Sequence, residues 1–196
     1  HILSDDIYEH IKYDNFNFYT IAQNSKLKDR TLTMNGVSKS YAMTGWRIGY
    51  AAGPKDIIKA IGKIQSQSTS NPSSISQAAA VEALNGNQGF IQKRSKAFKE
   101  RRDFVVTSLN NIKGINCLTP NGAFYVFPSC KDLLSKKTKL KTDTDFVQKL
   151  LEKSNVAVVQ GSAFGLDGYF RISYATSMQN LKKAMERIKS FCEGLT

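Results

Sequence analysis

Hydrophobic residues along the chain form short apolar runs and longer stretches with helical spacing. Short runs rich in β-branched and aromatic residues predict strands at positions 2–3, 31–35 and 48–52. Four isoleucines at positions 57, 58, 61 and 64 follow Pro54, which favours the first turn of a helix. Further helical patterns cover 75–84 and 88–111. The first part of the chain is therefore expected to mix strands and helices.

From Gly114 onward, strands and helices alternate in a second pattern. Apolar runs predict a hairpin of strands at 115–118 and 123–127 around Pro120-Asn121-Gly122, and later strands at 156–159 and 169–174. A helix beginning near Phe146 can be capped by Asp143 or Thr144, and Ser177 can cap a terminal amphipathic helix. This pattern is typical of an α+β domain.

Composition narrows the class of protein. Hydrophobic residues make up 41% and charged residues 22% of the 196 residues, as in ordinary globular domains. No apolar run is long enough to span a bilayer, so we expect no membrane partner. Cys117, Cys130 and Cys192 show neither metal-ligand spacing nor a disulfide framework. We therefore expect no metal site and a reducing, cytoplasmic setting.

The net charge of +12 raises the alternative of a basic nucleic-acid-binding module. Basic residues cluster at 93–102 and again at 131–141. Aromatic residues are not interleaved with them, and no nucleic-acid-binding motif accompanies them. We therefore expect no nucleic-acid partner, and we interpret the first cluster as a solvated helix face whose charge favours anionic substrates.

The segment 35–50 concentrates the residues with catalytic potential. It places small residues, Lys39 and Arg47 between two predicted strands. A lysine amine becomes a nucleophile toward aldehydes when burial or a neighbouring cation lowers its pKa. Pyridoxal phosphate carries an aldehyde and a phosphate, and it requires an acid beside its ring nitrogen, a role open to Asp5 at the end of the first strand. On these residues alone, an exposed Lys39 without a catalytic role is the simpler alternative.

A longer pattern around Lys39 resembles a known family. Ser38-Lys39 with the run 42–49 (AMTGWRIG) resembles the cofactor-attachment motif of the class I pyridoxal-phosphate-dependent aminotransferases, and is most similar to the bacterial aspartate aminotransferase branch. Similar stretches follow in the family's order at 4–10, 122–125, 158–165 and 170–175. The resemblance covers nearly the whole chain but only the C-terminal half of the family's length.

The resemblance implies an α/β fold of the fold-type I pyridoxal-phosphate-dependent transferases. Residues 1–86 would be the C-terminal part of the large cofactor-binding domain. Residues 87–113 would form a connecting helix, and residues 114–196 a small α+β C-terminal domain.

The resemblance also implies a role for five residues. Lys39 would be the catalytic residue, linked to pyridoxal 5'-phosphate and moving the substrate proton. Asp5 would bind the ring nitrogen of the cofactor, Tyr8 its phenolic oxygen and Arg47 its phosphate. Arg171 would bind the substrate α-carboxylate, a bidentate task that suits a guanidinium.

The implied reaction is a ping-pong amino transfer between an amino acid, L-aspartate first, and a 2-oxo acid such as 2-oxoglutarate. Alternatives within the same fold are an aromatic, alanine or prephenate aminotransferase. The alternative from a different class is a basic binding module without catalysis. The family's specificity residues have no counterpart in this chain, so we expect it to be inactive alone. Members of the family are usually homodimers, so the resemblance implies a homodimer at full length.

Two positions depart from the family's pattern. Gly36 stands where the family often has a phosphate-binding serine, and Gln160 stands where a proline commonly precedes glycine.

Three of the assigned residues also have a purely structural interpretation. Without the resemblance, Asp5 would be a helix cap, Tyr8 a half-buried core residue and Arg171 a surface ion-pair partner. Three aromatic residues are expected to lie mostly in the core under either interpretation: Phe124, Tyr125 and Phe164.

Overall fold

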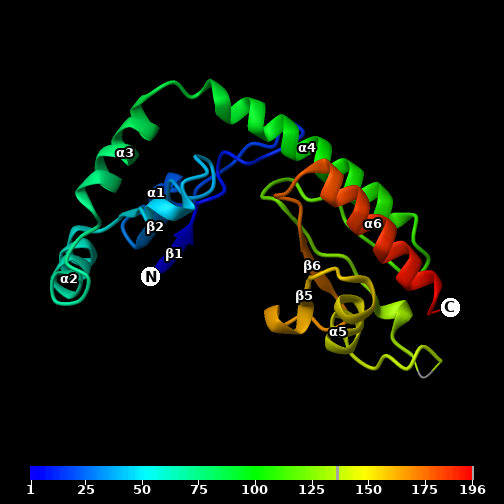
Figure 1. The fold of residues 1–196 in the computed structure, drawn as a ribbon. Coiled ribbons are helices and arrows are strands. Elements are labelled where there is room, and N and C mark those ends of the chain that lie inside the picture. The colour runs from blue at the N-terminus through cyan, green and yellow to red at the C-terminus, as the bar shows by residue number, and fades with distance from the viewer. Residues whose placement is uncertain (136, 196) are drawn as a thin grey trace. The chain divides into compact units, whose positions relative to one another are not determined.

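The computed structural model describes residues 1–135 and 137–195, which form two compact units, His1–Ser95 and Lys96–Thr196 (Figure 1). The boundary falls within the longest helix, α4 (Gly89–Asn110). This helix was expected from the pattern at 88–111. The division into parts at 86/87 and 113/114 stays a prediction.

The first unit is built on a three-stranded sheet of order β1-β2-β3. Strands β1 (Ile2–Asp5) and β2 (Thr31–Gly36) are parallel, and β3 (Gly49–Ala52) is antiparallel to β2. The three predicted strands are therefore confirmed to within a few residues. The remaining elements are η1 (Ile21–Gln23), α1 (Ser25–Lys28), η2 (Thr44–Trp46), α2 (Lys55–Ser66) and α3 (Ser74–Asn85).

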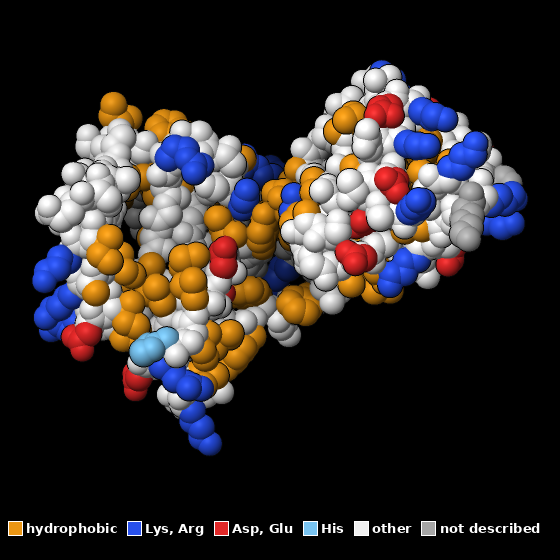
Figure 2. Space-filling model, turned by 90° about the horizontal axis from the view of Figure 1, so that it is seen from below, with side chains coloured by type: hydrophobic (Ala, Val, Ile, Leu, Met, Phe, Trp, Pro, Cys, Tyr) orange, Lys and Arg blue, Asp and Glu red, His pale blue; other side chains and the backbone are white. Residues whose placement is uncertain are grey.

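The helical spacing of the isoleucines correctly predicted helix α2, but it did not predict how exposed the helix is. Pro54 directly precedes the helix as expected, yet none of the residues of α2 is buried. Ile64, for example, is 70% exposed. Figure 2 shows the first unit as the body with the pale-blue histidine side chain. Hydrophobic side chains cover much of the face of this unit that is seen there. Periodicity thus identifies the apolar face of a helix, but not what covers it.

The second unit has a three-stranded antiparallel sheet of order β4-β6-β5, with β6 in the middle. Its core includes the tilted pair Phe146–Phe170, with ring centroids 5.0 Å apart, and the side chains of Leu109, Tyr174 and Ile188. Its elements after α4 are β4 (Tyr125–Val126), η3 (Lys131–Leu133), α5 (Asp143–Ser154), β5 (Val159–Gln160), η4 (Gly161–Phe164), β6 (Phe170–Ser173) and α6 (Met178–Glu193).

The hairpin predicted for 115–118 and 123–127 is wrong. The side chain of Asn110 donates to the Cys117 carbonyl at 2.9 Å and accepts from the Cys117 amide at 2.8 Å. The amide and the carbonyl of Cys117 therefore bond to a side chain and not to a second strand of a hairpin. Asn116 instead bridges to Ser129, and β4 pairs with β6.

The N-terminal cap of α5 also differs from the prediction. Thr142, not Asp143 or Thr144, is the cap residue, and it forms a capping box with Asp145. Asp143 is the first helical residue, and its buried carboxylate accepts a hydrogen bond from the Ser162 amide at 2.6 Å. The predicted cap Ser177 of α6 is confirmed. Within residues 1–135 and 137–195, no helix combines the length and the apolar character that crossing a membrane requires.

A buried arginine ties α4 to the loop before β4. Arg102 is only 2% exposed, and its guanidinium donates to Asp103 at 2.9 and 2.7 Å and to the Pro120 carbonyl at 2.9 Å. Partial burial by itself raises the pKa of Asp103, but hydrogen bonds from Lys99 and Arg102 outweigh it and leave that pKa below its ordinary value.

Replacing this arginine should destabilise the second unit. We expect Arg102→Met to lower the free energy of unfolding by about 2–4 kcal/mol, because the Pro120 carbonyl loses its buried donor. The exposed neighbour on the same helix provides the control, since Lys96→Met should change the free energy by less than about 0.5 kcal/mol. Denaturant titration followed by circular dichroism measures both. Equal effects of the two substitutions would contradict a structural role for Arg102.

The pH dependence of this difference follows from the lowered pKa of Asp103. The ion pair stabilises the folded chain above the unfolded pKa of about 4, and this contribution is lost as pH falls through the lower folded value. The difference between wild type and Arg102→Met should therefore shrink below about pH 4.

Candidate active site

Three strand ends of the first unit meet at one edge of the sheet. Because β1 and β2 are parallel, with Asp5 opposite Met34, their carboxyl ends lie at the same edge. Because β3 is antiparallel to β2, with Gly36 opposite Gly49, its amino end lies there as well. Ligands of open α/β sheets bind outside the carboxyl ends of parallel strands. Asp5, Lys39 and Arg47 therefore all belong to chain segments that leave or enter the sheet at this edge.

Buried residues at both ends hold the Lys39 segment. Val37 and Ile48, which start and end the connection between β2 and β3, are buried together with Ala80 of α3. The Met43 amide donates to the Val37 carbonyl at 3.4 Å, and the Ala42 amide to the Lys39 carbonyl at 3.1 Å. Lys39 is half-buried at the start of this tight turn. Its backbone position is thus fixed by packing on each side.

Arg47 is exposed, and its backbone adopts the left-handed conformation with φ 56°. Its guanidinium donates to the Thr44 carbonyl at 2.9 Å. Ala42 in the same segment also has a positive φ, of 54°. Left-handed conformations at residues other than glycine cost of order 1 kcal/mol or more and concentrate at functional sites. The segment between β2 and β3 therefore stores backbone strain.

Asp5 and Tyr8 lie at the end of β1 and in the turn that follows it. Asp5 is exposed, and its carboxylate accepts a hydrogen bond from the Ile7 amide at 3.2 Å, which forms a local turn and not the helix cap considered above. Tyr8 is half-buried, and its carbonyl accepts from the Ile11 amide. Asn35 donates to Glu9 at 2.6 Å and so ties this turn to β2.

Two further contacts position the lysine segment from a distance along the chain. The Tyr41 hydroxyl donates to Gln88 at 3.0 Å, and the Ser40 carbonyl accepts from Arg94 at 3.3 Å. Burial, followed by the nearby Glu9 carboxylate, raises the pKa of Tyr41, so this phenol stays protonated at neutral pH. Sequence reasoning missed Glu9, Gln88 and Arg94, because none lies near Lys39 in the sequence.

The departure at Gly36 has a geometric cause. A Cβ atom at this position would lie 2.9 Å from the Ile48 carbonyl oxygen and 3.3 Å from the Cα of Gly49. Any side chain, including a serine, would therefore push β3 away from β2. The glycine allows the two backbones that flank the lysine segment to approach closely.

Arg171 lies on β6 of the second unit and is half-buried. Its guanidinium carbon is 4.7 Å from the ring centre of Tyr125 and 4.5 Å from that of Phe164. Among the described residues, no carboxylate lies within salt-bridge distance of it, which does not fit the surface ion pair considered above. Phe164 is 49% exposed and Tyr125 half-buried, so the expectation that these rings lie mostly in the core is wrong.

The His, Cys, Asp and Glu side chains form no further candidate site among the described residues. No group of three or more His, Cys, Asp or Glu side chains that could hold a metal occurs in the part of the chain that the structure describes. Burial raises the pKa of Cys117 to about 11 and, with smaller charge effects, that of Cys130 and Cys192 to about 12. These thiols are therefore protonated and inert at neutral pH.

Comparison with known sequences places this fold in one family. The sequence profile described as "Aminotransferase class I and II" matches residues 1–188. The chain belongs to this family, and the expected α/β fold of the fold-type I enzymes is confirmed by its structural neighbours.

Two curated relatives indicate the branch. The aspartate aminotransferase of Rhizobium meliloti (strain 1021) is 59% identical over 200 residues, which are 100% of this chain and 49% of that protein. The probable aspartate/prephenate aminotransferase of Rhizobium leguminosarum bv. phaseoli is 59% identical over 196 residues, covering 97% of this chain and 49% of that protein. The chain thus spans about half the length of the curated relatives it matches.

Solved aminotransferase structures have the same fold as this chain. The aspartate aminotransferase of Rhizobium meliloti superposes with a TM-score of 0.94 at 60% identity, over 97% of this chain and 49% of that one. The aromatic aminotransferase of Pyrococcus horikoshii OT3 gives a TM-score of 0.90 at 39% identity, over 99% of this chain and 52% of that one.

The crowding at Gly36 is directly testable. We expect Gly36→Ala to lower the free energy of unfolding by about 1–3 kcal/mol, because the new methyl group meets the Ile48 carbonyl. Gly45→Ala is the matched control in the same segment, since its Cβ would meet nothing within 4 Å. That substitution should be neutral or slightly stabilising. Denaturant unfolding measures both, and a neutral Gly36→Ala would show that the close approach is dispensable.

Proposed function

We propose that the intact protein is a pyridoxal-phosphate-dependent aminotransferase and that this chain carries its cofactor-linked lysine. The observation that supports this most is that the segments bearing the Asp5 carboxylate, the Lys39 amine and the Arg47 guanidinium all leave or enter the sheet at one edge. A carboxylate, an amine and a guanidinium are the groups that the ring nitrogen, aldehyde and phosphate of pyridoxal phosphate require. The donor set therefore fits this cofactor.

Four residues of the first unit would hold and use the cofactor. When bound, it supplies an electron sink for the bonds of the substrate α-carbon. Asp5 would keep the ring nitrogen protonated, Tyr8 would donate to the phenolic oxygen, and Arg47 would bind the phosphate. Lys39 would supply the amine that holds the cofactor covalently and would move the proton of the substrate α-carbon.

Arg171 of the second unit would bind the α-carboxylate of each substrate. Its guanidinium has no carboxylate partner among the described residues, so it keeps the capacity to bind one. A planar guanidinium binds a carboxylate through two parallel N–H···O bonds, which also fixes the orientation of the substrate.

We propose L-aspartate and 2-oxoglutarate as the substrates of a two-stage ping-pong reaction. The names of the most similar relatives support aspartate and make prephenate the second candidate, whereas the aromatic and alanine alternatives are less supported. A homodimer and a cytoplasmic setting, both expected from the sequence, complete the proposal.

The non-catalytic basic module is a weaker alternative. Two of the positive charges on α4 are engaged within the fold, since Arg102 is buried and Lys99 pairs with Asp103 at 2.7 Å. They contribute little to an open basic surface. Salt-dependent nucleic-acid binding without any cofactor uptake would favour this alternative over the enzyme.

Lys39 should be the site of covalent cofactor attachment. Borohydride reduction of the intact protein with pyridoxal phosphate should attach the cofactor to the peptide that contains Lys39, as peptide mass spectrometry would show. We expect Lys39→Ala to abolish this attachment and to lower turnover roughly 10²–10⁴-fold or more, because the proton-moving group is lost.

The exposed Lys63 on α2 provides the control for chemical labelling. Lys63→Ala should leave both the attachment and the turnover unchanged. Attachment to a different lysine in the wild-type protein would refute the role of Lys39 while leaving the family membership intact.

A panel of amino donors should separate the substrate alternatives. With 2-oxoglutarate as acceptor, we expect kcat/KM for L-aspartate to exceed that for phenylalanine, tyrosine and alanine. Prephenate is tested as the acceptor with aspartate as the donor. A higher kcat/KM for an aromatic donor than for aspartate would overturn the proposed substrate but not the reaction type.

A further inference from the structure

The guanidinium of Arg171 lies over two aromatic rings. Its central carbon lies 4.7 Å from the Tyr125 centroid and 4.5 Å from the Phe164 centroid, both well within the range of cation–π contact. The two rings come from different elements, since Tyr125 begins β4 and Phe164 ends η4. This arrangement, called the aromatic clamp below, consists of Tyr125, Arg171 and Phe164.

The sheet register explains why these side chains meet. Tyr125 is opposite Ser173 in the antiparallel β4–β6 pair. Arg171 is two residues from Ser173 and therefore projects from the same face of the sheet, as a diagonal neighbour of Tyr125. On the other side, Arg171 is opposite Val159 of β5, and η4 with Phe164 follows β5 directly.

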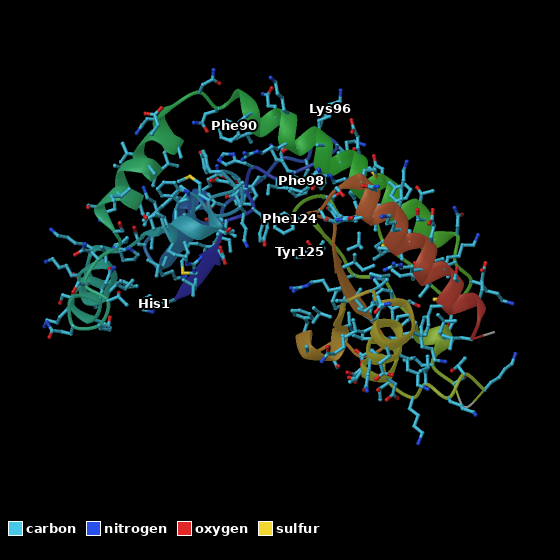
Figure 3. The ribbon with its side chains drawn as sticks, in the orientation of Figure 1. His1, Phe90, Lys96, Phe98, Phe124 and Tyr125 are labelled. Atoms are coloured by element: carbon cyan, nitrogen blue, oxygen red, sulfur yellow. The ribbon has the colours of Figure 1, made fainter. Side chains whose placement is uncertain are left out.

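Each ring of the clamp is supported by a further ring. Phe124 packs against Tyr125 at 4.7 Å, and Phe98 stacks on Phe124 at 5.6 Å. Figure 3 shows Phe98, Phe124 and Tyr125 following one another from α4 toward the sheet of the second unit. On the opposite side, Phe127 lies edge-to-face with Phe164 at 5.9 Å. Neither clamp ring can turn away without disturbing its supporting neighbour.

We propose that Tyr125 and Phe164 are positioning residues that hold the Arg171 guanidinium with its N–H groups available to a substrate carboxylate. A cation–π contact with a ring does not use the N–H donors of a guanidinium in hydrogen bonds, so these donors stay available for bidentate binding of a carboxylate. The rings also restrict the rotamers of the long arginine side chain before substrate binds. Less side-chain conformational entropy is therefore lost on binding. This inference rests on the proposed role of Arg171 in binding the substrate carboxylate.

The exposure of Phe164 supports this role over a core role. A phenylalanine that is 49% exposed contributes less to folding than a buried one, yet its ring lies 4.5 Å from the Arg171 guanidinium. Leu166, 44% exposed and two residues further on, has no ring to place over a cation and provides a control of similar exposure.

The kinetic test uses the intact protein and four substitutions. Phe164→Leu and Tyr125→Leu, which remove a ring, should raise KM for both the amino acid and the 2-oxo acid roughly 3- to 30-fold with kcat within about twofold. Tyr125→Phe, which keeps the ring, should retain a nearly wild-type KM. Leu166→Ala should change neither constant. An unchanged KM in both Leu variants, or a fall in kcat and cofactor uptake without a change in KM, would overturn the proposal.

A second readout does not depend on turnover. Rotation of the Arg171 guanidinium about its Nε–Cζ bond can be followed by ¹⁵N NMR in the substrate-free protein, with Arg171→Lys to assign the signal. We expect slow rotation in the wild type and faster rotation in Phe164→Leu. If the intact protein has no aminotransferase turnover, the proposed function fails. The rotation measurement alone then tests whether the aromatic clamp holds the guanidinium in position. Equal rotation rates in the two proteins would overturn it.

Discussion

The close approach of β2 and β3 at the Gly36–Gly49 pair is the constraint on which the first unit depends. Since no Cβ fits at Gly36, this pair fixes how near the two strands lie and where the connecting segment begins and ends. Residues 37–48 must then form a closed loop at the carboxyl edge of β1 and β2. A slip of one residue would move the buried Val37 and Ile48 to the opposite face, so the register is strongly specified.

The second unit holds Arg171 by a different means. Along β6, Phe170 and Ile172 are buried, whereas Arg171 between them projects from the other face of the sheet. Ring contacts from neighbouring elements position the guanidinium there. The first unit thus fixes Lys39 and Arg47 through the main chain, and the second fixes Arg171 through ring contacts.

Much of this architecture follows from local sequence, and the failures have identifiable causes. Helices α3, α4 and α6 and the strands of the first sheet were predicted because their hydrophobic periodicity and the cap at Ser177 are local signals. The hairpin at 115–127 failed because one side chain, Asn110, occupies the backbone groups of Cys117. No propensity or turn motif reports such a competition.

The same limit applies to the candidate site. The motif around Lys39 identified Lys39 and Arg47, because both lie in one short segment. The hydrogen bonds Asn35–Glu9 and Tyr41–Gln88 join residues 26 and 47 positions apart, which spacing alone does not pair. Phe164 was expected to lie mostly in the core, yet it is 49% exposed and its ring contacts a cation.

The position of the clamp finally depends on one face of α4. Phe98 and Arg102 are four residues apart and therefore lie on the same side of this helix. Phe98 stacks on Phe124, and Arg102 donates to the carbonyl of Pro120. The stretch from Pro120 to Phe124 is thus fixed at two points, one polar and one aromatic, directly before Tyr125. Since Tyr125 supplies one ring over Arg171, a rotation of α4 would be transmitted to the guanidinium that we assign to the substrate carboxylate.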